Sequence, residues 1–430
     1  MELNDIILHT YPWWEMQRVR ELSFRAKAPE QRLSNVWHHA PGLVDHKYRG
    51  VTTPNCDTLY SGTWLDLDEG PILIEVPASD LPYWSIAVMD LNTDNIDILG
   101  SRYADSGSLL VCGPGYRGPI SCGCRHVLSA SKVVWLLARY LIGSDTLLAQ
   151  AEALRRAVTL TRFKNDGSPS GTTPCPARLP LIAATRKNAQ NFWQIIRTTL
   201  DEDGTLSGTF DSALYKGIQK IWPPGVGDWN DLVPDAQHRF TEAFDRVLAQ
   251  VTANNSGNMQ TRGQWRYPGK DIGRFGENRL YRAEVSLWGL GALPTSEVMY
   301  VSAVADAQGE LFQGSNQYKF RIPTEGMPAE EFWSLTMYEV DPHGGMYFTE
   351  NSLKRYAIGD RTGGLNKNAD GSIDIFLSHA QPHAVNELTN WLPAPAGVFR
   401  LMIRLYAPTE AFQKGELSPP SVERLSAKLT

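Results

Sequence analysis

The segment from Thr53 to Leu67 holds the densest group of residues able to do chemistry. Asn55 is typical of a turn, and Asp57 follows it at the start of a predicted strand. Side chains alternate along a strand, so Tyr60 and Trp64 share one face. The opposite face is apolar and holds Leu59, Leu65 and Leu67. A carboxylate and a phenol can act as general base and general acid. We therefore predict Asp57 and Tyr60 as catalytic residues, with Asn55 and Trp64 as binding residues.

A second candidate carboxylate, Asp90, follows the strand-like run from Tyr83 to Met89. We predict that it joins the catalytic pair in a concave site, with Trp84 as part of an aromatic wall. The alternative interpretation is structural. Turn residues such as Asn55 and Asp57 often bond the backbone amides of their own turn and do no chemistry.

The run from Phe332 to Tyr338 alternates in the same way. Its apolar face, with Trp333, Leu335 and Met337, is explained by a sandwich core. The other face ends in Tyr338, which we predict as a binding residue. We also predict that arginines approach the pocket, because a guanidinium fork suits a carboxylate or an enolate-like oxygen. These are Arg139, Arg282 and Arg355. The alternative is an ordinary surface ion pair.

Metal and cofactor motifs are weak in this sequence. His379 and His383 are separated by a segment that contains Pro382, which argues against a shared helical face and a zinc spacing. Cys122 and Cys124 are interpreted as buried thiols. The Gly113–Gly118 loop lacks a phosphate-binding pattern, and Ser61 lacks a nucleophile elbow. We predict no cofactor and no metal. A metal-dependent alternative stays open, in which ligands converge from distant strands: His38, His39, His46, His379 and His383.

Composition limits the partners. The net charge of −6 and the pI of about 5.9 leave no broad positive field, so nucleic acid is not an expected partner. No stretch reaches the length of apolar residues that spans a bilayer, so we expect no membrane partner. The N-terminus lacks the pattern of a secretory signal, and the five cysteines are odd in number and sparse, typical of reduced thiols. We expect a cytoplasmic protein whose partner is a small molecule.

The pattern of elements predicts how these residues are positioned. At 430 residues, the chain is longer than the length at which a single hydrophobic core stops growing, so two or three domains are expected. An amphipathic helix is predicted from Ile7 to Lys27, covering a sheet. Short β-type runs fill residues 1–145, helix formers dominate 146–270, with helices near 183–200, 211–221 and 235–252, and β-patterning returns in 271–430. We predict a mainly β fold with α, in which a helical middle segment joins two β-domains.

Two groups of motifs resemble a known family. The stretch from Pro54 to Ser61, with Asp90 and Gly100 downstream, resembles domain of unknown function 1254. A second group resembles its usual partner, domain of unknown function 1214: Glu331–Tyr338, Asn351, Arg355–Gly359, Asp370–Ser372 and Asn390–Pro395. The resemblance implies two β-sandwich domains of jelly-roll type, a homo-oligomer and few established activities. Trp84 departs from the Tyr-Tyr-Ser expected there, which removes a second phenol.

Three functions are compatible with these patterns. The first is a cofactor-independent hydrolase- or lyase-like enzyme that acts on a small organic molecule in a cleft between the β-domains, with Asp57 as base and Tyr60 as acid. In that reading Arg282 or Arg355 holds an anionic group. The second is a non-catalytic binding or assembly protein, because sandwich folds host both. The third is the metal-dependent sandwich enzyme.

Overall fold

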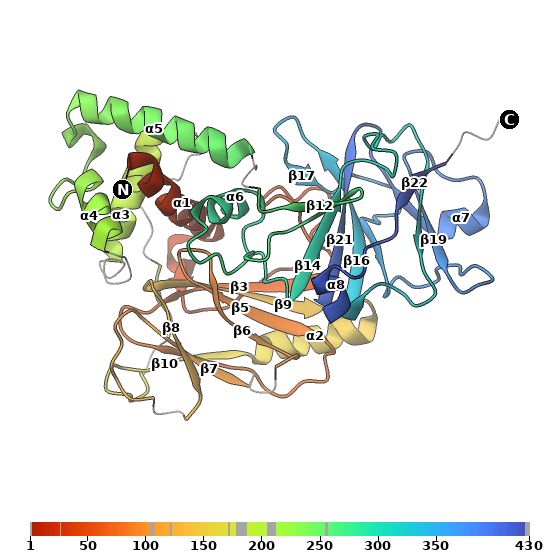
Figure 1. Ribbon diagram of the computed structural model, residues 1–430. Helices are drawn as coiled ribbons and strands as arrows, with labels where there is room; N and C mark the ends of the chain where they lie inside the picture. Colours follow the sequence, from red (N-terminus) through yellow and green to blue (C-terminus); the bar gives the residue numbers. More distant parts are fainter. Residues whose placement is uncertain are drawn as a thin grey trace.

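The computed structural model describes residues 2–25, 27–103, 107–120, 123–170, 173–177, 187–203, 212–253 and 257–425. Within these residues the chain forms two β-sandwiches and a group of helices (Figure 1). The mainly β organisation with two sandwiches and a helical middle is therefore confirmed. Cys122 and residues 183–186 of a predicted helix lie outside the described residues.

The first sandwich is built from two antiparallel-rich sheets. One has the order β2-β3-β9-β5-β6, with bounds His38–His39, Thr58–Asp66, Val133–Leu141, Trp84–Met89 and Asn95–Gly100. The other has the order β10-β4-β7-β8, with bounds Thr159–Arg162, Ile72–Glu75, Ser108–Cys112 and Arg125–Leu128. Apolar side chains from both sheets, such as Leu65 and Ile74, share one core. Burial of these side chains from water stabilises the sandwich.

The boundary of the first sandwich lies beyond residue 145. Helix α2 (Asp145–Ala157) contributes Ala151 and Leu154 to the sandwich core. Strand β10 then pairs with β4 along four residues. Because this helix and this strand complete the first core, they belong to the first sandwich and not to a linking region.

The second sandwich has the same plan. One sheet has the order β12-β13-β14-β21-β16-β17, with β18 also paired to β16, and bounds Gln260–Arg262, Trp265–Tyr267, Val298–Ala303, Phe399–Pro408, Ala329–Val340, Met346–Tyr347 and Ala357–Gly359. The other has the order β20-β19-β15-β22, with bounds Trp391–Pro393, Ile373–Ser378, Tyr318–Ile322 and Val422–Arg424. Their shared core includes Trp333, Leu335 and Met337, as the alternation in the sequence predicts. Short helices α7 (Val385–Thr389) and α8 (Glu410–Lys414) flank it.

The remaining helices gather around the first one. Helix α1 (Leu3–Arg25) contacts α3, α4, α5 and α6, with bounds Ala189–Glu202, Ser212–Ile221, Pro234–Ala253 and Arg279–Trp288. Figure 1 shows α1 beneath α5, with α3 and α4 to its left, α6 to its right and the first sandwich below. One apolar cluster joins Trp14 of α1, Phe244 of α5 and Trp135 of β9. The predicted N-terminal helix is confirmed, and its buried residues lie on all of its sides.

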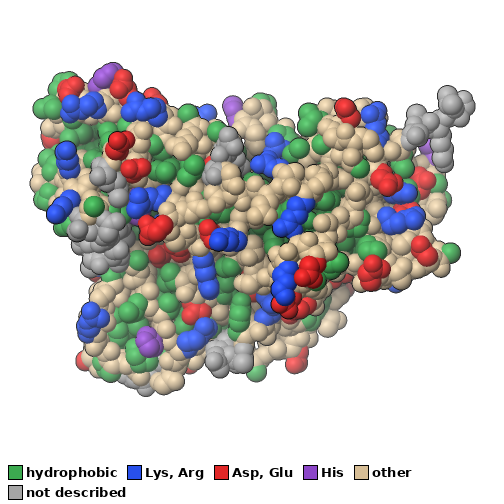
Figure 2. Space-filling view, in the orientation of Figure 1, with side chains coloured by type: hydrophobic (Ala, Val, Ile, Leu, Met, Phe, Trp, Pro, Cys, Tyr) green, Lys and Arg blue, Asp and Glu red, His purple; other side chains and the backbone are tan. Residues whose placement is uncertain are grey.

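Small elements connect these parts. A two-stranded ribbon pairs β1 (Leu33–Ser34) with β11 (Cys175–Pro176), and two 3-10 turns span Pro29–Gln31 and Trp229–Asp231. On the face shown in Figure 2, acidic and basic side chains are interspersed. Among the described helices, none combines the length and the apolar character that crossing a membrane requires. Cys56, Cys112 and Cys175 are free thiols, but Cys124 is disulfide-bonded, which corrects the expectation of reduced thiols throughout.

Candidate functional site

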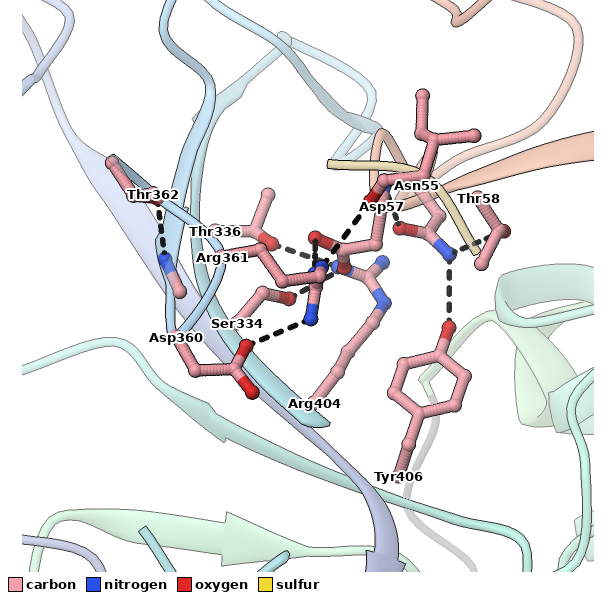
Figure 3. Close-up of polar contacts among 12 residues, drawn as sticks. Asn55, Asp57, Thr58, Ser334, Thr336, Asp360, Arg361, Thr362, Arg404 and Tyr406 are labelled. Atoms are coloured by element: carbon pink, nitrogen blue, oxygen red, sulfur yellow. Dashed lines mark hydrogen bonds and ion pairs between the residues drawn. The ribbon is translucent and has the colours of Figure 1, made fainter. Parts of the chain in front are cut away.

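The two sandwiches meet along a polar face that we call the seam. It consists of side chains from the turn before β3 and from strands β3, β5, β9, β14, β16 and β21, together with Tyr83, Glu297 and Arg361. Asn55 lies at its centre (Figure 3): its Oδ1 accepts a hydrogen bond from the Asp57 amide at 2.8 Å. Its Nδ2 donates to the hydroxyl of Tyr406 at 2.9 Å and of Tyr60 at 3.2 Å. Asn55 therefore fixes its own turn and joins the two sandwiches.

The carboxylate of Asp57 bonds across the seam. Ser334 on β16 donates to Oδ2 of Asp57 at 2.6 Å, and the Arg361 guanidinium donates to Oδ1 at 3.1 Å. Arg361 also lies over the ring of Phe332, 4.1 Å from its centre, and pairs with Asp360. Both carboxylate oxygens of Asp57 therefore accept hydrogen bonds from the second sandwich. We call these contacts the Asp57 joint. Its geometry suits holding two domains together.

Both terminal nitrogens of Arg404 on β21 have hydrogen-bond partners although the residue is only 3% exposed. Its guanidinium donates to the hydroxyls of Thr336 at 2.9 Å and Tyr338 at 2.7 Å, and to the Thr53 carbonyl at 3.0 Å. Tyr338 in turn donates to the Pro54 carbonyl at 2.6 Å. The predicted residue Tyr338 therefore lies in the seam, where it anchors the turn that carries Asn55 and Asp57.

Arg139 on β9 is buried as deeply, at 5% exposure, but is poorly satisfied. It stands opposite Tyr60 of β3 in the sheet, and its guanidinium lies 5.5 Å from the centre of the Tyr60 ring. Nη2 donates to the Gly291 carbonyl at 2.6 Å, whereas Nη1 has no hydrogen-bond partner within the described part of the chain. A buried guanidinium without an anionic partner is unusual, because desolvation of a charge is costly.

Four phenols surround Arg139: Tyr60, Tyr83, Tyr300 and Tyr406. Burial alone would lower the pKa of Arg139. Electrostatic interaction with the four phenols has the larger effect, and the pKa of Arg139 is raised. Burial also raises the pKa of Tyr406, and the neighbouring phenols of Tyr60 and Tyr300 raise it further. Burial raises the pKa of Tyr300 as well. These two phenols therefore stay protonated near neutral pH and can donate hydrogen bonds.

The oxygens of these phenols already accept hydrogen bonds. Asn55 donates to Tyr60 and Tyr406, and the Leu293 amide donates to the Tyr300 hydroxyl at 3.3 Å. A hydroxyl that accepts in this way still has its own hydrogen to donate. The surroundings of Arg139 are therefore rich in donors, which is the chemistry that binds an anion.

Glu297 is fully buried and lies next to Tyr83 at one end of the seam. Tyr83 donates to its Oε1 at 2.7 Å, and Tyr103 and Arg102 each contact Oε2 at 2.8 Å. The ring of Tyr83 packs edge-on against Phe332 and Tyr406. Arg102 belongs to the first sandwich and Glu297 directly precedes β14, so this pair is a second ionic link between the sandwiches.

Two predicted residues form a separate cluster. Asp90 accepts hydrogen bonds from the Asp94 amide and the Asn92 side chain, both at 3.2 Å, and Arg282 on α6 donates to Asp94 at 2.9 Å. Burial, followed by the charge of Asp94, raises the pKa of Asp90 to about 7. The cluster fastens the turn between β5 and β6 to α6. It does not meet Asp57 or Tyr60.

Three further predicted binding residues have partners outside the seam. Trp64 stacks on Trp135 with ring centres 5.4 Å apart, in the core beneath α1. Trp84 packs inside the first sandwich, because it points to the face of β5 opposite Tyr83. Arg355 donates to the carbonyls of Thr389 and Trp391, both at 2.9 Å. The seam brings together Asn55, Asp57, Tyr60, Arg139 and Tyr338 from the predicted set.

The histidines considered as metal ligands are dispersed. His39 bonds Ser61 at 2.7 Å, His46 bonds Tyr356 at 3.0 Å and His379 bonds a backbone carbonyl. Over the residues that the structure describes, no three His, Cys, Asp or Glu side chains are grouped to hold a metal ion. Two surface hollows, of about 480 and 490 Å³, lie on β15 and β22 and around the Gly113–Gly118 loop, away from the seam.

Sequence reasoning missed several seam residues: Tyr83, Glu297, Tyr300, Arg361, Arg404 and Tyr406. A signal was present in β21, where Arg404 and Tyr406 alternate with Ile403 and Leu405. Polar residues at every second position mark a face that is not part of the sandwich core. Arg361 and Glu297 lie in connecting segments, and alternation cannot identify residues of that kind.

Comparisons with solved structures include one that supports the fold. The VPA0106 protein from Vibrio parahaemolyticus, known from a crystal structure, is similar over 99% of this chain and 100% of its own, with 20% identity and a TM-score of 0.69. An uncharacterized protein from Burkholderia cenocepacia has 12% identity and a TM-score of 0.45, over 99% of this chain and 93% of its own. No curated protein matches the chain.

Two family models match, each described as a protein of unknown function. DUF1254 matches residues 34–162, and DUF1214 matches residues 297–410. The first range spans β2 to β10 and the second spans Glu297 to the start of α8, so each family lies mainly within one sandwich. The chain belongs to the family that pairs an N-terminal DUF1254 with a C-terminal DUF1214 domain.

Proposed function

We propose that this protein is a hydrolase- or lyase-like enzyme that binds a small organic acid in the seam between its sandwiches. The observation that carries the proposal is the unpaired Nη1 of buried Arg139 within a group of phenols. An anion bound there gains a charge-assisted hydrogen bond and relieves the cost of the unpaired charge. Tyr60 and Tyr300 are only partly buried, so the ligand approaches Arg139 past their rings.

The surroundings favour a planar, partly apolar acid. The stacked rings of Phe332 and Tyr406, with centres 3.9 Å apart, and the ring of Tyr83 give the phenol hydroxyls aromatic, apolar surroundings. Such surroundings favour a ligand with apolar, aromatic character, while the guanidinium binds the carboxylate. We therefore propose an aromatic or enolisable carboxylic acid as the ligand class.

The phenols would act in the chemical step as donors. Protonated phenols and a guanidinium stabilise negative charge that develops on an oxygen, as in ester cleavage or enolate formation. Asp57 was expected to be the base, but in this proposal it serves as a domain joint because Ser334 and Arg361 already bond both of its oxygens.

A ligand screen tests the anion site. Benzoate, phenylacetate and phenylpyruvate are each expected to raise the melting temperature. At a ligand concentration of 100 times Kd, binding adds about 2.7 kcal/mol to the free energy of unfolding. Arg139→Met should abolish the response. Arg321→Gln, at a surface pair with Asp374, is the matched control and should keep it. Equal responses in wild type and Arg139→Met would refute the site.

A non-catalytic binding protein is the second candidate. The close packing of the seam favours this candidate, because Phe332 and Tyr406 stack directly on each other. This packing leaves a bound ligand little room for the change of shape that a reaction requires. Mass spectrometry of each stabilising ligand after incubation separates the two. A chemically changed ligand supports the enzyme, and a ligand recovered intact supports a binding protein.

We also propose a homo-oligomer, on the strength of the family resemblance, and a cytoplasmic location, on the strength of the sparse cysteines. Light scattering coupled to gel filtration should give a mass that is a multiple of 47.9 kDa. Fractionation of the source cells checks the compartment. A single-chain mass at micromolar concentration would contradict the oligomer without affecting the anion site.

A further inference from the structure

The proposed site has donors around Arg139 but needs a group that can accept a proton. Glu297 is the buried carboxylate at the other end of the seam. It is fully buried, and its Oε1 receives the hydroxyl of Tyr83 at 2.7 Å. We propose that Glu297, acting through Tyr83, takes a proton from a C–H group of the acid bound at Arg139, so that the substrate is an enolisable acid of the 2-keto acid class.

Tyr83 is positioned for such a relay. Its hydroxyl lies 3.1 Å from Ser85 Oγ, and Ser85 stands opposite Arg139 across the β5–β9 pair. Its hydroxyl therefore lies between Glu297 and Ser85, and Ser85 is the residue paired with Arg139 in the sheet. Within the described residues, Tyr83 is the phenol of the four that donates to a carboxylate.

The proton and electron balance is complete without another reactant. The C–H proton passes to the Tyr83 oxygen while the Tyr83 proton passes to Glu297 Oε1. The electron pair of the C–H bond stays on the substrate as an enolate, whose oxygen is stabilised by Arg139 and the protonated phenols. Tyr83 leaves the step as a neutral phenol, and Glu297 leaves it as a neutral acid.

Glu297 also has an exit for this proton. The hydroxyl of Tyr103 donates to Glu297 Oε2 at 2.8 Å, and the Tyr103 side chain is 36% exposed. Exchange of protons through Tyr103 would return Glu297 to its ionised form. Arg102 also donates to Oε2, at 2.8 Å. In this scheme Tyr83 is catalytic and Glu297 is a positioning residue that acts through it.

This inference rests on the proposed function, because the substrate must first bind at Arg139. The experiment follows the loss of the C3 hydrogens of phenylpyruvate by proton NMR in deuterated buffer, with the uncatalysed rate subtracted. Wild type should exchange them. Glu297→Gln should slow the exchange by about 100-fold or more with little change in half-saturation. Glu297→Asp, which keeps a carboxylate, should recover part of the rate.

Two further variants separate the relay from a purely structural role. Tyr83→Phe leaves Glu297 in place and should slow exchange as much as Glu297→Gln does. If Glu297→Gln fails to fold, Tyr83→Phe still tests the relay. Arg321→Gln, at the exposed pair with Asp374, lies outside the seam and should keep the exchange rate within about threefold. Wild-type exchange in Glu297→Gln, or an equal loss in Arg321→Gln, would overturn the inference.

The two proposals fail in different ways. Phenylpyruvate that stabilises wild type but not Arg139→Met, without any exchange, would overturn the relay and leave the anion site intact. Phenylpyruvate that fails to stabilise wild type would count against both proposals. Exchange that persists in Arg139→Met would overturn the anion site as the place where the enolate forms.

Discussion

Arg139 and Arg404 are two buried arginines on facing sheets, and their surroundings differ. The guanidinium of Arg404 donates to Thr336, Tyr338 and the Thr53 carbonyl. That of Arg139 donates to the Gly291 carbonyl, and its Nη1 has no hydrogen-bond partner among the residues that the structure describes. Burial alone therefore does not identify a functional arginine. The informative quantity is how many of its donors the protein itself satisfies.

The largest expected effect is at the satisfied arginine. Arg404→Met leaves the Thr53 carbonyl and the hydroxyls of Thr336 and Tyr338 without their donor, so we expect a loss of about 4 kcal/mol in the free energy of unfolding. Urea unfolding followed by tryptophan fluorescence measures it. A loss below about 1 kcal/mol would remove the distinction between the two arginines.

Asp90 offers a test on a buried carboxylate. Because its folded-state pKa of about 7 lies above the unfolded value, the protonated form favours the folded state, and stability falls as the pH rises from about 4 to about 7. Between about pH 5 and pH 8 this loss amounts to about 2–3 kcal/mol. Asp90→Asn should flatten that part of the pH profile. Burial also raises the pKa of Asp94. The variant leaves Asp94 and its partner Arg282 in place. An unaltered slope would contradict the assignment.

A third variant weakens the Asp57 joint. Asp57→Asn removes the charge that pairs with Arg361, and we expect a loss of about 2 kcal/mol. Ligand-dependent stabilisation should persist, since Arg139 is untouched. Ser334→Ala is the milder companion, expected to cost about 1 kcal/mol. Loss of ligand binding without loss of stability would instead support the catalytic role first expected for Asp57.

The smallest expected effect on stability is at the unsatisfied arginine. Arg139→Met removes one hydrogen bond to Gly291 together with a buried unpaired charge, and these two changes oppose each other. The free energy of unfolding without ligand should change by less than about 1 kcal/mol. The same urea titration applies. A loss as large as that of Arg404→Met would show that Arg139 is also a structural element.

The fold was largely predictable because local patterns determine it. Alternation in the Phe332–Tyr338 run correctly separated core residues from those that face the seam. Helices near 211–221 and 235–252 correspond to α4 and α5. The boundary at residue 145 was less predictable, because the pairing of β10 with β4 is a long-range contact.

The candidate site was predicted only in part, for a physical reason. Asn55, Asp57 and Tyr60 are neighbours in sequence and share one turn and strand, so they were found together. Their partners Arg361 and Tyr406 are more than 300 residues away and meet them only when the sandwiches pack. Trp84 shows the opposite error: one step along β5 places its ring in the core and Tyr83 in the seam.

The burial of α1 has a consequence for how the protein is made. This helix, with Trp13 and Trp14 on its surface, is synthesised before its partners α3, α5 and α6, which extend as far as Trp288. At about 5–20 residues per second, synthesis of those partners takes on the order of 10 seconds or more. During that interval the apolar helix has no native core to enter. Newly made chains are therefore expected to engage a chaperone at their N-terminal segment until α6 has emerged.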